Sequence, residues 1–185
     1  MHIVVVYESM FGNTREIAEA IAEGARESQQ SAAVRVSTGD QHLVSTADLL
    51  VVGAPTHIWS LSRPATRQEA ARQAELPGSS LHLQGGATGT GMREWLQQRP
   101  QLPPRAAVFD TRRDMPAVFS GRASRVISRS LRASGVRLVC PPESFLIDKN
   151  SALVPGELAR ARQWGQQLAL DAQPVSMRGH QDELL

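Results

Sequence analysis

A strand, a short polar loop and a helix follow one another at the start of the chain, and this succession most constrains the fold. Residues 4–6 are consecutive valines, an apolar and β-branched run that predicts a buried strand. Apolar residues then recur at helical spacing from residue 14 to about residue 28. A buried strand that leads directly into a helix is typical of an open parallel sheet.

The loop between this strand and this helix carries groups that bind phosphate. Ligands of open parallel sheets sit beyond the carboxyl ends of the strands, where backbone N–H groups and the positive end of a helix converge. Ser9 and Thr14 supply hydroxyls, Asn13 supplies an amide, and Gly12 allows a sharp turn or a close approach to an anion. The loop has no lysine and no Walker or G-x-G-x-x-G spacing, which argues against a nucleoside triphosphate and a dinucleotide.

The segment Tyr7-Glu8-Ser9-Met10-Phe11-Gly12-Asn13-Thr14 resembles the phosphate loop of the flavodoxin family. In that family a T/S-x-T/x-G-x-T loop follows the first strand and holds the phosphate of flavin mononucleotide (FMN). The resemblance implies that the phosphate is bound by Ser9, Met10, Phe11, Gly12, Asn13 and Thr14. An alternative is a helix cap without a ligand, in which Asn13 or Thr14 closes the first turn and Glu16 completes a capping box.

A second loop of the family follows the third strand. Residues 47–53 are a nearly continuous apolar run, which predicts a central strand covered on both faces. The resemblance implies that the loop after it borders the flavin, with the contacts Pro55, Thr56, His57, Ile58 and Trp59. Trp59 stands where flavodoxins place an aromatic residue against the isoalloxazine ring. For Trp59, the alternative is that its side chain folds back onto the core. His57 is either a titratable group near the flavin or a solvated side chain.

A third loop is expected at residues 110–116, after a strand at residues 105–109. In flavodoxins this loop holds the far side of the flavin, so the resemblance implies contacts from Asp110, Thr111 and Arg112. The family commonly places a tyrosine here, but no aromatic residue precedes Phe119. The second face of the ring is therefore expected to be open or covered by Met115.

Arg112 and the adjacent Arg113 allow two interpretations. A cation near the N1 edge stabilises the anionic reduced flavin, so the last reduction potential would be less negative than in a typical flavodoxin. Alternatively, both arginines are solvated loop residues.

The remaining elements continue the alternation of strands and helices. We expect an edge strand at residues 32–37, and a helix from 62 to about 76 that Ser62 caps and Pro64 begins. A flexible connection at 85–91 precedes a short helix at 92–98 that turns Trp95 and Leu96 to the core. Further helices are expected at 120–134 and 156–170, the last with Leu158, Ala161 and Leu168 inward and Trp164 beside them. The fifth strand at 136–140 is broken by Pro141 and Pro142 and resumes at 143–147.

These elements predict an α/β fold, a doubly wound five-stranded parallel sheet of order 2-1-3-4-5 with helices on both faces. The short gap in the fifth strand leaves no room for the insertion of long-chain flavodoxins, so the resemblance is to the short-chain type. We expect a flavodoxin-like FMN-binding domain over residues 1–172 and a flexible tail over 173–185.

Composition limits the function classes. The 185 residues suit one domain, and no apolar run approaches the roughly 20 residues of a membrane span or forms a signal peptide, so a cytoplasmic protein is expected. A lone Cys140 excludes an internal disulfide and is expected to be a buried small hydrophobe. The net charge of +2 is too small to argue for nucleic acid, but it departs from flavodoxins, which are usually acidic and dock on basic partners. Scattered histidines predict neither a metal site nor a hydrolase, and no catalytic residue is assigned.

The resemblance implies an FMN-binding redox protein, foremost a low-potential electron carrier between a reductase and an acceptor enzyme. One alternative is an FMN-dependent oxidoreductase of the quinone reductase or protoporphyrinogen oxidase type, which turns over a substrate against the open face of the ring. Another is a degenerate flavodoxin fold that binds no flavin. The oligomeric state is left open between a monomer and a weak dimer.

Overall fold

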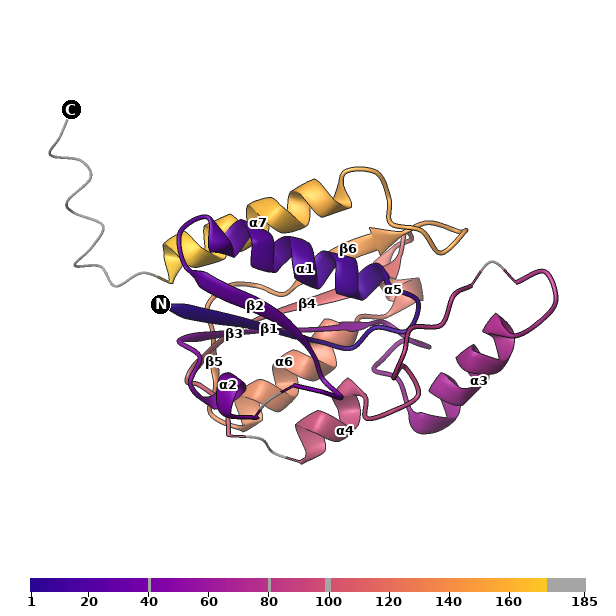
Figure 1. Cartoon of the computed structure of the whole chain (residues 1–185), viewed down its shortest axis with the longest axis horizontal. Helices are drawn as coiled ribbons and strands as arrows, with labels where there is room; N and C mark the ends of the chain where they lie inside the picture. Colours follow the sequence, from indigo (N-terminus) through magenta and orange to yellow (C-terminus); the bar gives the residue numbers. More distant parts are fainter. Residues whose placement is uncertain (40, 80, 99–100, 173–185) are drawn as a thin grey trace, which may run out of the picture.

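The computed structural model describes residues 1–39, 41–79, 81–98 and 101–172 and has three layers (Figure 1). A parallel sheet forms the middle layer. Helices α1 (Asn13–Arg26) and α7 (Glu157–Asp171) cover one face, and α6 (Ala123–Ala133) with the short α2 (Gln41–Ser45) and α4 (Met92–Gln97) covers the other. The predicted α/β architecture with helices on both faces is confirmed.

The sheet order is β2-β1-β3-β4-β5, as predicted, and all pairs are parallel. The five strands of this order are β1 (His2–Tyr7), β2 (Gln30–Arg35), β3 (Leu49–Pro55), β4 (Arg105–Arg113) and β5 (Arg137–Leu138). Residues 49–54 of β3 are fully buried, because both faces of this central strand are covered, whereas β2 lies at the edge and stays partly exposed. Register pairs Tyr7 with Gly53 and Pro55 with Thr111, so the carboxyl ends of three strands meet at one edge.

Two short strands share the fifth position of the sheet. β5 (Arg137–Leu138) pairs with the start of β4, and β6 (Glu143–Ile147) pairs with residues 109–113 at its end. Pro141 and Pro142 lie in the gap and have no N–H to donate to the ladder, which explains the predicted break. The first of these two strands, β5, is shorter than expected, because only two of residues 136–140 pair with β4.

Alternate residues of the central strands point to opposite faces of the sheet and pack into two separate hydrophobic cores. Ile3 and Val5 pack toward α1 and α7, whereas Val4 and Val6 pack toward α6. On the α7 side, Phe109, Phe145 and Trp164 make edge-to-face contacts with ring centroids 6.0–6.4 Å apart.

The core-facing predictions for the short and the closing helices are mostly confirmed. Trp95, Leu96, Ala161 and Leu168 are buried, and Trp164 packs against the same core as α7. Leu158 was expected to face inward but is 44% exposed, because it lies in the first turn of α7 on the solvent side.

The structure corrects three expectations near the candidate site. β4 continues to Arg113, so Asp110, Thr111 and Arg112 lie in a strand and not in a loop. The residue before α3 (Pro64–Ala74) is Arg63, so Ser62 does not cap this helix, although Pro64 does begin it.

The third correction concerns the helix expected from residue 120. The corresponding helix, α6, begins only at Ala123, and a separate short helix, α5 (Ala117–Ser120), precedes it. Gly121, between the two, has a positive φ of 73° and interrupts the helical path. In the described part of the chain no helix is long and apolar enough to cross a membrane. The tail expected at residues 173–185 lies outside the described residues.

Candidate functional site

Three segments predicted to form one site meet at the carboxyl edge of the sheet. The Thr14 and Thr111 hydroxyls are 2.7 Å apart, which joins the start of α1 to β4. The Thr56 N–H donates to the Thr111 carbonyl at 2.7 Å, which joins the segment after β3 to the same residue. The structure thus brings together the three groups of predicted residues through Thr111.

The start of α1 presents unused backbone donors. The first N–H that bonds back is that of Glu16, which donates to the Gly12 carbonyl at 3.0 Å. The N–H groups of Asn13, Thr14 and Arg15 have no acceptor within the described ranges. Unused N–H groups at the positive end of a helix dipole are the kind of donors that bind anions in proteins.

No side chain caps α1, so the alternative of a ligand-free cap by Asn13 or Thr14 is wrong. The Asn13 amide instead donates to the Ser151 carbonyl at 2.8 Å, and Thr14 bonds to Thr111. The Ser9 hydroxyl accepts the Gly12 N–H at 3.2 Å and so fixes the bend of the loop. The chain therefore shapes residues 9–14, which we call the phosphate loop after its predicted role, without closing the end of the helix.

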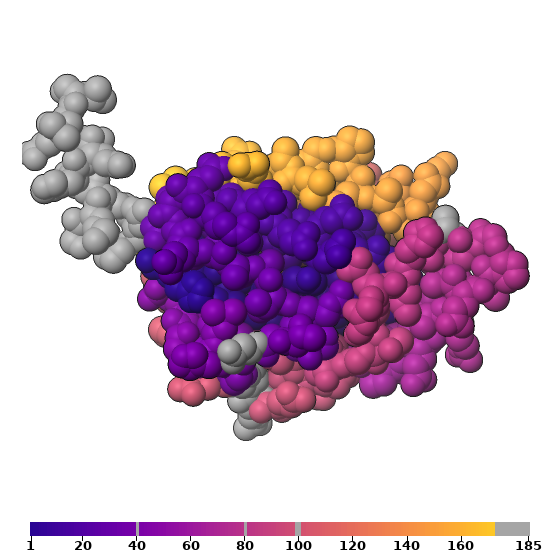
Figure 2. Space-filling view, viewed as in Figure 1, coloured from indigo at the N-terminus to yellow at the C-terminus, as the bar shows by residue number. Residues whose placement is uncertain are grey.

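Arg35 and Gln84 hold the phosphate loop from outside. Arg35 donates to the Ser9 carbonyl at 2.8 Å and to the Gln84 side chain at 3.0 Å, and the Gln84 N–H donates to the Met10 carbonyl at 2.8 Å. In Figure 2 the chain after α3, in magenta and pink, lies against the indigo N-terminal part of the surface. Sequence reasoning missed both residues, because they come from β2 and from a connection that carried no motif.

A tight turn at residues 57–60, the Trp59 turn, follows β3. His57 and Ser60 exchange backbone hydrogen bonds of 2.7 and 3.1 Å, and the two residues between them have positive φ, 44° at Ile58 and 71° at Trp59. Glycine and asparagine favour such a turn, so a β-branched residue and an aromatic residue hold it under strain. Trp59 is 61% exposed, which excludes the alternative that it folds back onto the core.

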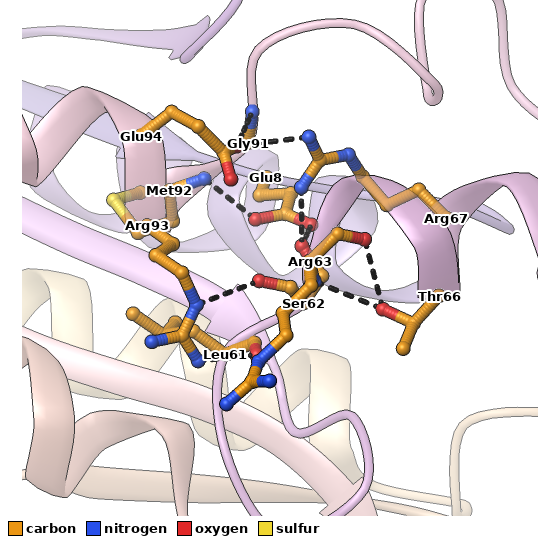
Figure 3. Close-up of polar contacts among 10 residues, drawn as sticks. All are labelled: Glu8, Leu61, Ser62, Arg63, Thr66, Arg67, Gly91, Met92, Arg93 and Glu94. Atoms are coloured by element: carbon orange, nitrogen blue, oxygen red, sulfur yellow. Dashed lines mark hydrogen bonds and ion pairs between the residues drawn. The ribbon is translucent and has the colours of Figure 1, made fainter.

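A buried polar network anchors the segment after the Trp59 turn (Figure 3). The Glu8 carboxylate, only 4% exposed, accepts the Ser62 hydroxyl and the Met92 N–H, the latter at 2.7 Å. The Ser62 hydroxyl in turn accepts from Arg67 at 2.9 Å, and Arg67 forms a 2.8 Å ion pair with Glu94. We call these four side chains, Glu8, Ser62, Arg67 and Glu94, the buried network.

Arg93 adds a second attachment from α4. Its guanidinium donates to the carbonyls of Leu61 and Ser62, which Figure 3 draws beside it, at 2.8 and 3.0 Å. It also donates to the Ser60 hydroxyl at 3.2 Å. The network and Arg93 together fix the Trp59 turn relative to the phosphate loop. The sequence predicted Ser62 only as a helix cap and gave the other residues no role; the one available signal was Glu8, a carboxylate directly after a buried strand.

The end of β4 supports α6. The Asp110 carboxylate accepts the Ser124 N–H at 2.9 Å, and the Thr56 hydroxyl accepts the Ala123 N–H at 3.0 Å. Both side chains therefore cap α6, and Asp110 is fully buried. Of the three predicted contacts that the structure places on β4, only Arg112 is partly exposed, and it donates to the Met115 carbonyl at 2.6 Å.

Apolar side chains are exposed around this edge. We define the apolar rim as five residues that are between 41% and 73% exposed: Ile58, Trp59, Met115, Val118 and Phe119. Its two parts are in contact, because Trp59 forms a β-bridge with Gly121, directly after α5. Exposed apolar side chains gathered at one edge are typical of a surface that meets a ligand or a partner.

Burial changes the pKa of His57 and that of Cys140. It lowers the pKa of His57 below its ordinary value, with the Glu8 carboxylate acting in the opposite direction. Burial also raises the pKa of the half-buried Cys140 thiol, and the carboxylates of Glu143 and Asp171 add to this, which keeps the thiol protonated. In the described ranges no three His, Cys, Asp or Glu side chains gather in a way that holds a metal ion.

Comparison with known proteins agrees with this geometry. The family model of the flavodoxin domain matches residues 4–112, which is more than half of the chain and includes all three predicted segments. No curated protein matches the sequence.

Solved structures of flavodoxins share the fold over nearly the whole chain. A flavodoxin from the domain Archaea is 18% identical with a TM-score of 0.63, over 93% of this chain and 99% of that one. Oxidised flavodoxin 1 from Bacillus cereus is 16% identical with a TM-score of 0.62, over 92% and 98%. A flavodoxin, WrbA-like protein from Agrobacterium tumefaciens is 17% identical with a TM-score of 0.56, over 92% and 96%. Given the matching family model, the sheet order and the open helix end after β1, this chain belongs to the flavodoxin family.

Proposed function

We propose that the chain binds FMN at the carboxyl edge of the sheet and acts as a low-potential electron carrier. The observation that carries this proposal is the start of α1, where three unused N–H groups lie beside the hydroxyls of Ser9 and Thr14. Such a cluster fits a phosphate monoester, and residues 9–15 contain no acidic side chain that would repel one.

The residues of the three segments take separate roles in this proposal. The phosphate loop, from Ser9 to Thr14, holds the phosphate, and residues 55–59 flank one side of the ring, with Trp59 stacking on it. Because the side chains of Asp110 and Thr111 already bind within the protein, they shape the second side, while Arg112 supplies positive charge. When bound, FMN supplies the electron-transfer chemistry.

The exposed apolar rim favours the carrier over an enzyme, because such a surface suits contact with other proteins. In this proposal the partners are a reductase and an acceptor enzyme in the cytoplasm, and each meets the chain through a small and transient contact. The chain acts as a monomer or a weak dimer and does not bind nucleic acid. One observation favours the alternative of a quinone reductase or protoporphyrinogen oxidase type of enzyme. No aromatic residue occurs between Asp110 and Pro116, the segment where a second stacking partner is expected, so a substrate has room to approach the ring.

A visible absorption spectrum of the purified protein, before and after addition of FMN, tests the proposal. Bound flavin that gains its electrons one at a time during stepwise reduction supports the carrier. Direct two-electron reduction with steady-state quinone turnover supports the enzyme, and no binding would overturn both in favour of a flavin-free domain.

A matched pair of variants tests the assigned phosphate site. Thr14→Val removes a hydroxyl from the phosphate loop and is expected to weaken FMN binding about tenfold, as the loss of a hydrogen bond to a charged group does. Thr46→Val removes an exposed hydroxyl that donates to carbonyls of α2, and is expected to leave FMN affinity unchanged. Flavin fluorescence titration measures both.

A further inference from the structure

A row of arginines follows one side of α6. Arg122, Arg125, Arg129 and Arg132 are spaced by three or four residues, so they share one side of the helix over about 15 Å. The last three are exposed, and Arg122, just before the helix, is half-buried. We call these four residues the arginine face.

The charge of the arginine face is not neutralised. No acidic residue occurs between Asp114 and Glu143. None of the four guanidiniums forms an ion pair or a side-chain hydrogen bond with any residue that the structure describes, whereas elsewhere Arg67 and Arg162 bind carboxylates at 2.8 and 3.0 Å. Four uncompensated charges on one helix create a positive local potential, although the net charge of the chain is only +2.

The arginine face borders a groove of about 450 Å³ that is also lined by Ser124 and Ser128. The hydroxyls of these serines are buried and have no hydrogen-bond partner among the described residues. Hydroxyl and guanidinium donors gathered in one groove suit carboxylate groups of a bound molecule.

The arginine face continues into the apolar rim. Arg122 directly follows Gly121, whose backbone forms the bridge to Trp59, and the exposed Phe119 precedes both. An apolar area next to a strongly charged one has the anatomy of a protein–protein interface, in which apolar contacts give affinity and charge steers the encounter.

We propose that the arginine face and the apolar rim form the docking surface for an acidic redox protein. The proposal rests on the proposed function, because the rim surrounds the candidate flavin edge. One electron passes between the partner's centre and the bound flavin, so that one is oxidised as the other is reduced, and no atom is transferred. This polarity is the reverse of the usual flavodoxin, which offers acidic groups to a basic partner.

A protein fits these observations better than a nucleic acid does. Single-strand binding surfaces interleave arginines with aromatic side chains for base stacking, and α6 has no aromatic residue. The aromatic residues of the apolar rim lie at one end of the arginine face and not along it.

Stopped-flow oxidation of the reduced FMN-loaded protein tests the proposal with two one-electron acceptors of opposite charge. The probes are plant plastocyanin, which is acidic, and mitochondrial cytochrome c, which is basic. We expect the plastocyanin rate constant to be the larger at low salt and to fall about tenfold as salt is raised, since screening weakens an attractive encounter. We expect the cytochrome c rate constant not to fall.

Two triple variants remove the same net charge. Arg125→Gln/Arg129→Gln/Arg132→Gln is expected to lower the low-salt plastocyanin rate constant about tenfold. Arg26→Gln/Arg72→Gln/Arg162→Gln, on α1, α3 and α7, is expected to change it by less than about twofold. Circular dichroism confirms that both variants fold, and oxidation by a small neutral quinone confirms that the flavin in each is competent.

The outcomes separate this proposal from the function on which it rests. Equal effects of the two triple variants, or a cytochrome c rate constant that exceeds that of plastocyanin, overturn the docking surface. Failure to bind FMN overturns the proposed function. The docking surface is then tested by fluorescence anisotropy of labelled plastocyanin with the flavin-free protein, and absence of binding overturns it. Tighter binding of a single-stranded oligonucleotide than of plastocyanin to the arginine face would assign it to nucleic acid instead.

Discussion

Two consecutive residues of the Trp59 turn carry its backbone strain. Positive φ values at Ile58 and Trp59 place a β-branched and an aromatic side chain where most turns have glycine or asparagine. Ile58 is 73% exposed, so burial of its own side chain offsets little of this cost. The strain presents Trp59 toward solvent, which is the orientation that ring stacking requires.

Replacing Ile58 is expected to release part of this strain. Ile58→Gly should raise the free energy of unfolding by about 1 kcal/mol, because a non-glycine residue in the left-handed region costs about that much. Ile58→Val keeps the β-branched geometry and should leave stability unchanged. Urea unfolding measures both variants, and a loss of stability in Ile58→Gly would show that the turn is not strained.

A second residue-scale prediction concerns the contact that holds the Trp59 turn against α5. A Cβ on Gly121 would lie 2.4 Å from the Trp59 Cα and carbonyl oxygen, both backbone atoms that cannot step aside. Gly121→Ala should therefore displace Trp59 and weaken FMN binding, measured by flavin fluorescence titration.

The control for this substitution is Gly78→Ala. Gly78 has a similar positive φ of 81° but nothing within 4 Å of the added Cβ, so it shares the backbone strain and lacks the collision. Comparable losses of FMN affinity in the two variants would refute the role of the Gly121 contact.

Among elements, the buried network does the most to place the site. Glu8 follows β1, Ser62 precedes α3, Arg67 lies in α3 and Glu94 lies in α4, so four parts of the chain are joined through side chains (Figure 3). Each carboxylate is matched by N–H or O–H donors, as buried charge requires.

Removing one member of this network should cost much more than removing a surface ion pair. Glu8→Ala leaves the buried Met92 N–H and Ser62 hydroxyl without their acceptor, and is expected to lower the free energy of unfolding by about 3 kcal/mol. Glu69→Ala, which breaks an exposed pair with Arg72 on α3, should cost less than about 0.5 kcal/mol. Equal losses in urea unfolding would show that the network is not a major support.

The sequence predicted the elements whose signal is local. Residues 4–6 and 49–52 are apolar because these strands are covered on both faces, and that pattern predicted two central strands. The order of the strands came with the family resemblance. The sequence did not predict the end of β4, because Asp110 and Arg112 are polar residues, which are unusual in a buried strand. Asp110 accepts a hydrogen bond from the start of α6, and Arg112 donates one to the loop after β4.

The supports of the site could not be predicted, for a different reason. Glu8 and Ser62 are 54 residues apart in sequence, and Arg35 and Gln84 are 49 apart, so no spacing rule connects them. The residues expected to touch the ligand were found through the family resemblance, whereas the residues that hold them in place appear only in the folded chain.

At the scale of the whole molecule, His57 couples stability to pH. Its pKa is lowered by burial in the folded state, so the unfolded chain binds more protons just below the ordinary histidine pKa of about 6.5. The stability that depends on neutral His57 is present above that pH and is lost as the pH falls through this range.

His57→Gln should therefore lose less stability than the wild type between about pH 7.5 and pH 5. His82→Gln, at an exposed position before the phosphate-loop support Gln84, should follow the wild-type curve. Thermal unfolding across this pH range provides the comparison, and parallel curves for wild type and His57→Gln would contradict the coupling.

The divided fifth strand also bears on how molecules of this protein behave toward one another. An uninterrupted edge strand exposes a row of backbone donors and acceptors that another chain can extend into a larger sheet. Here β5 pairs over two residues, two prolines follow, and β6 is met near its far end by Leu153 and by the Val154 N–H, which donates to the Leu146 carbonyl at 3.0 Å. A second chain finds no continuous template along this side, so the sheet is protected there against aggregation through strand addition.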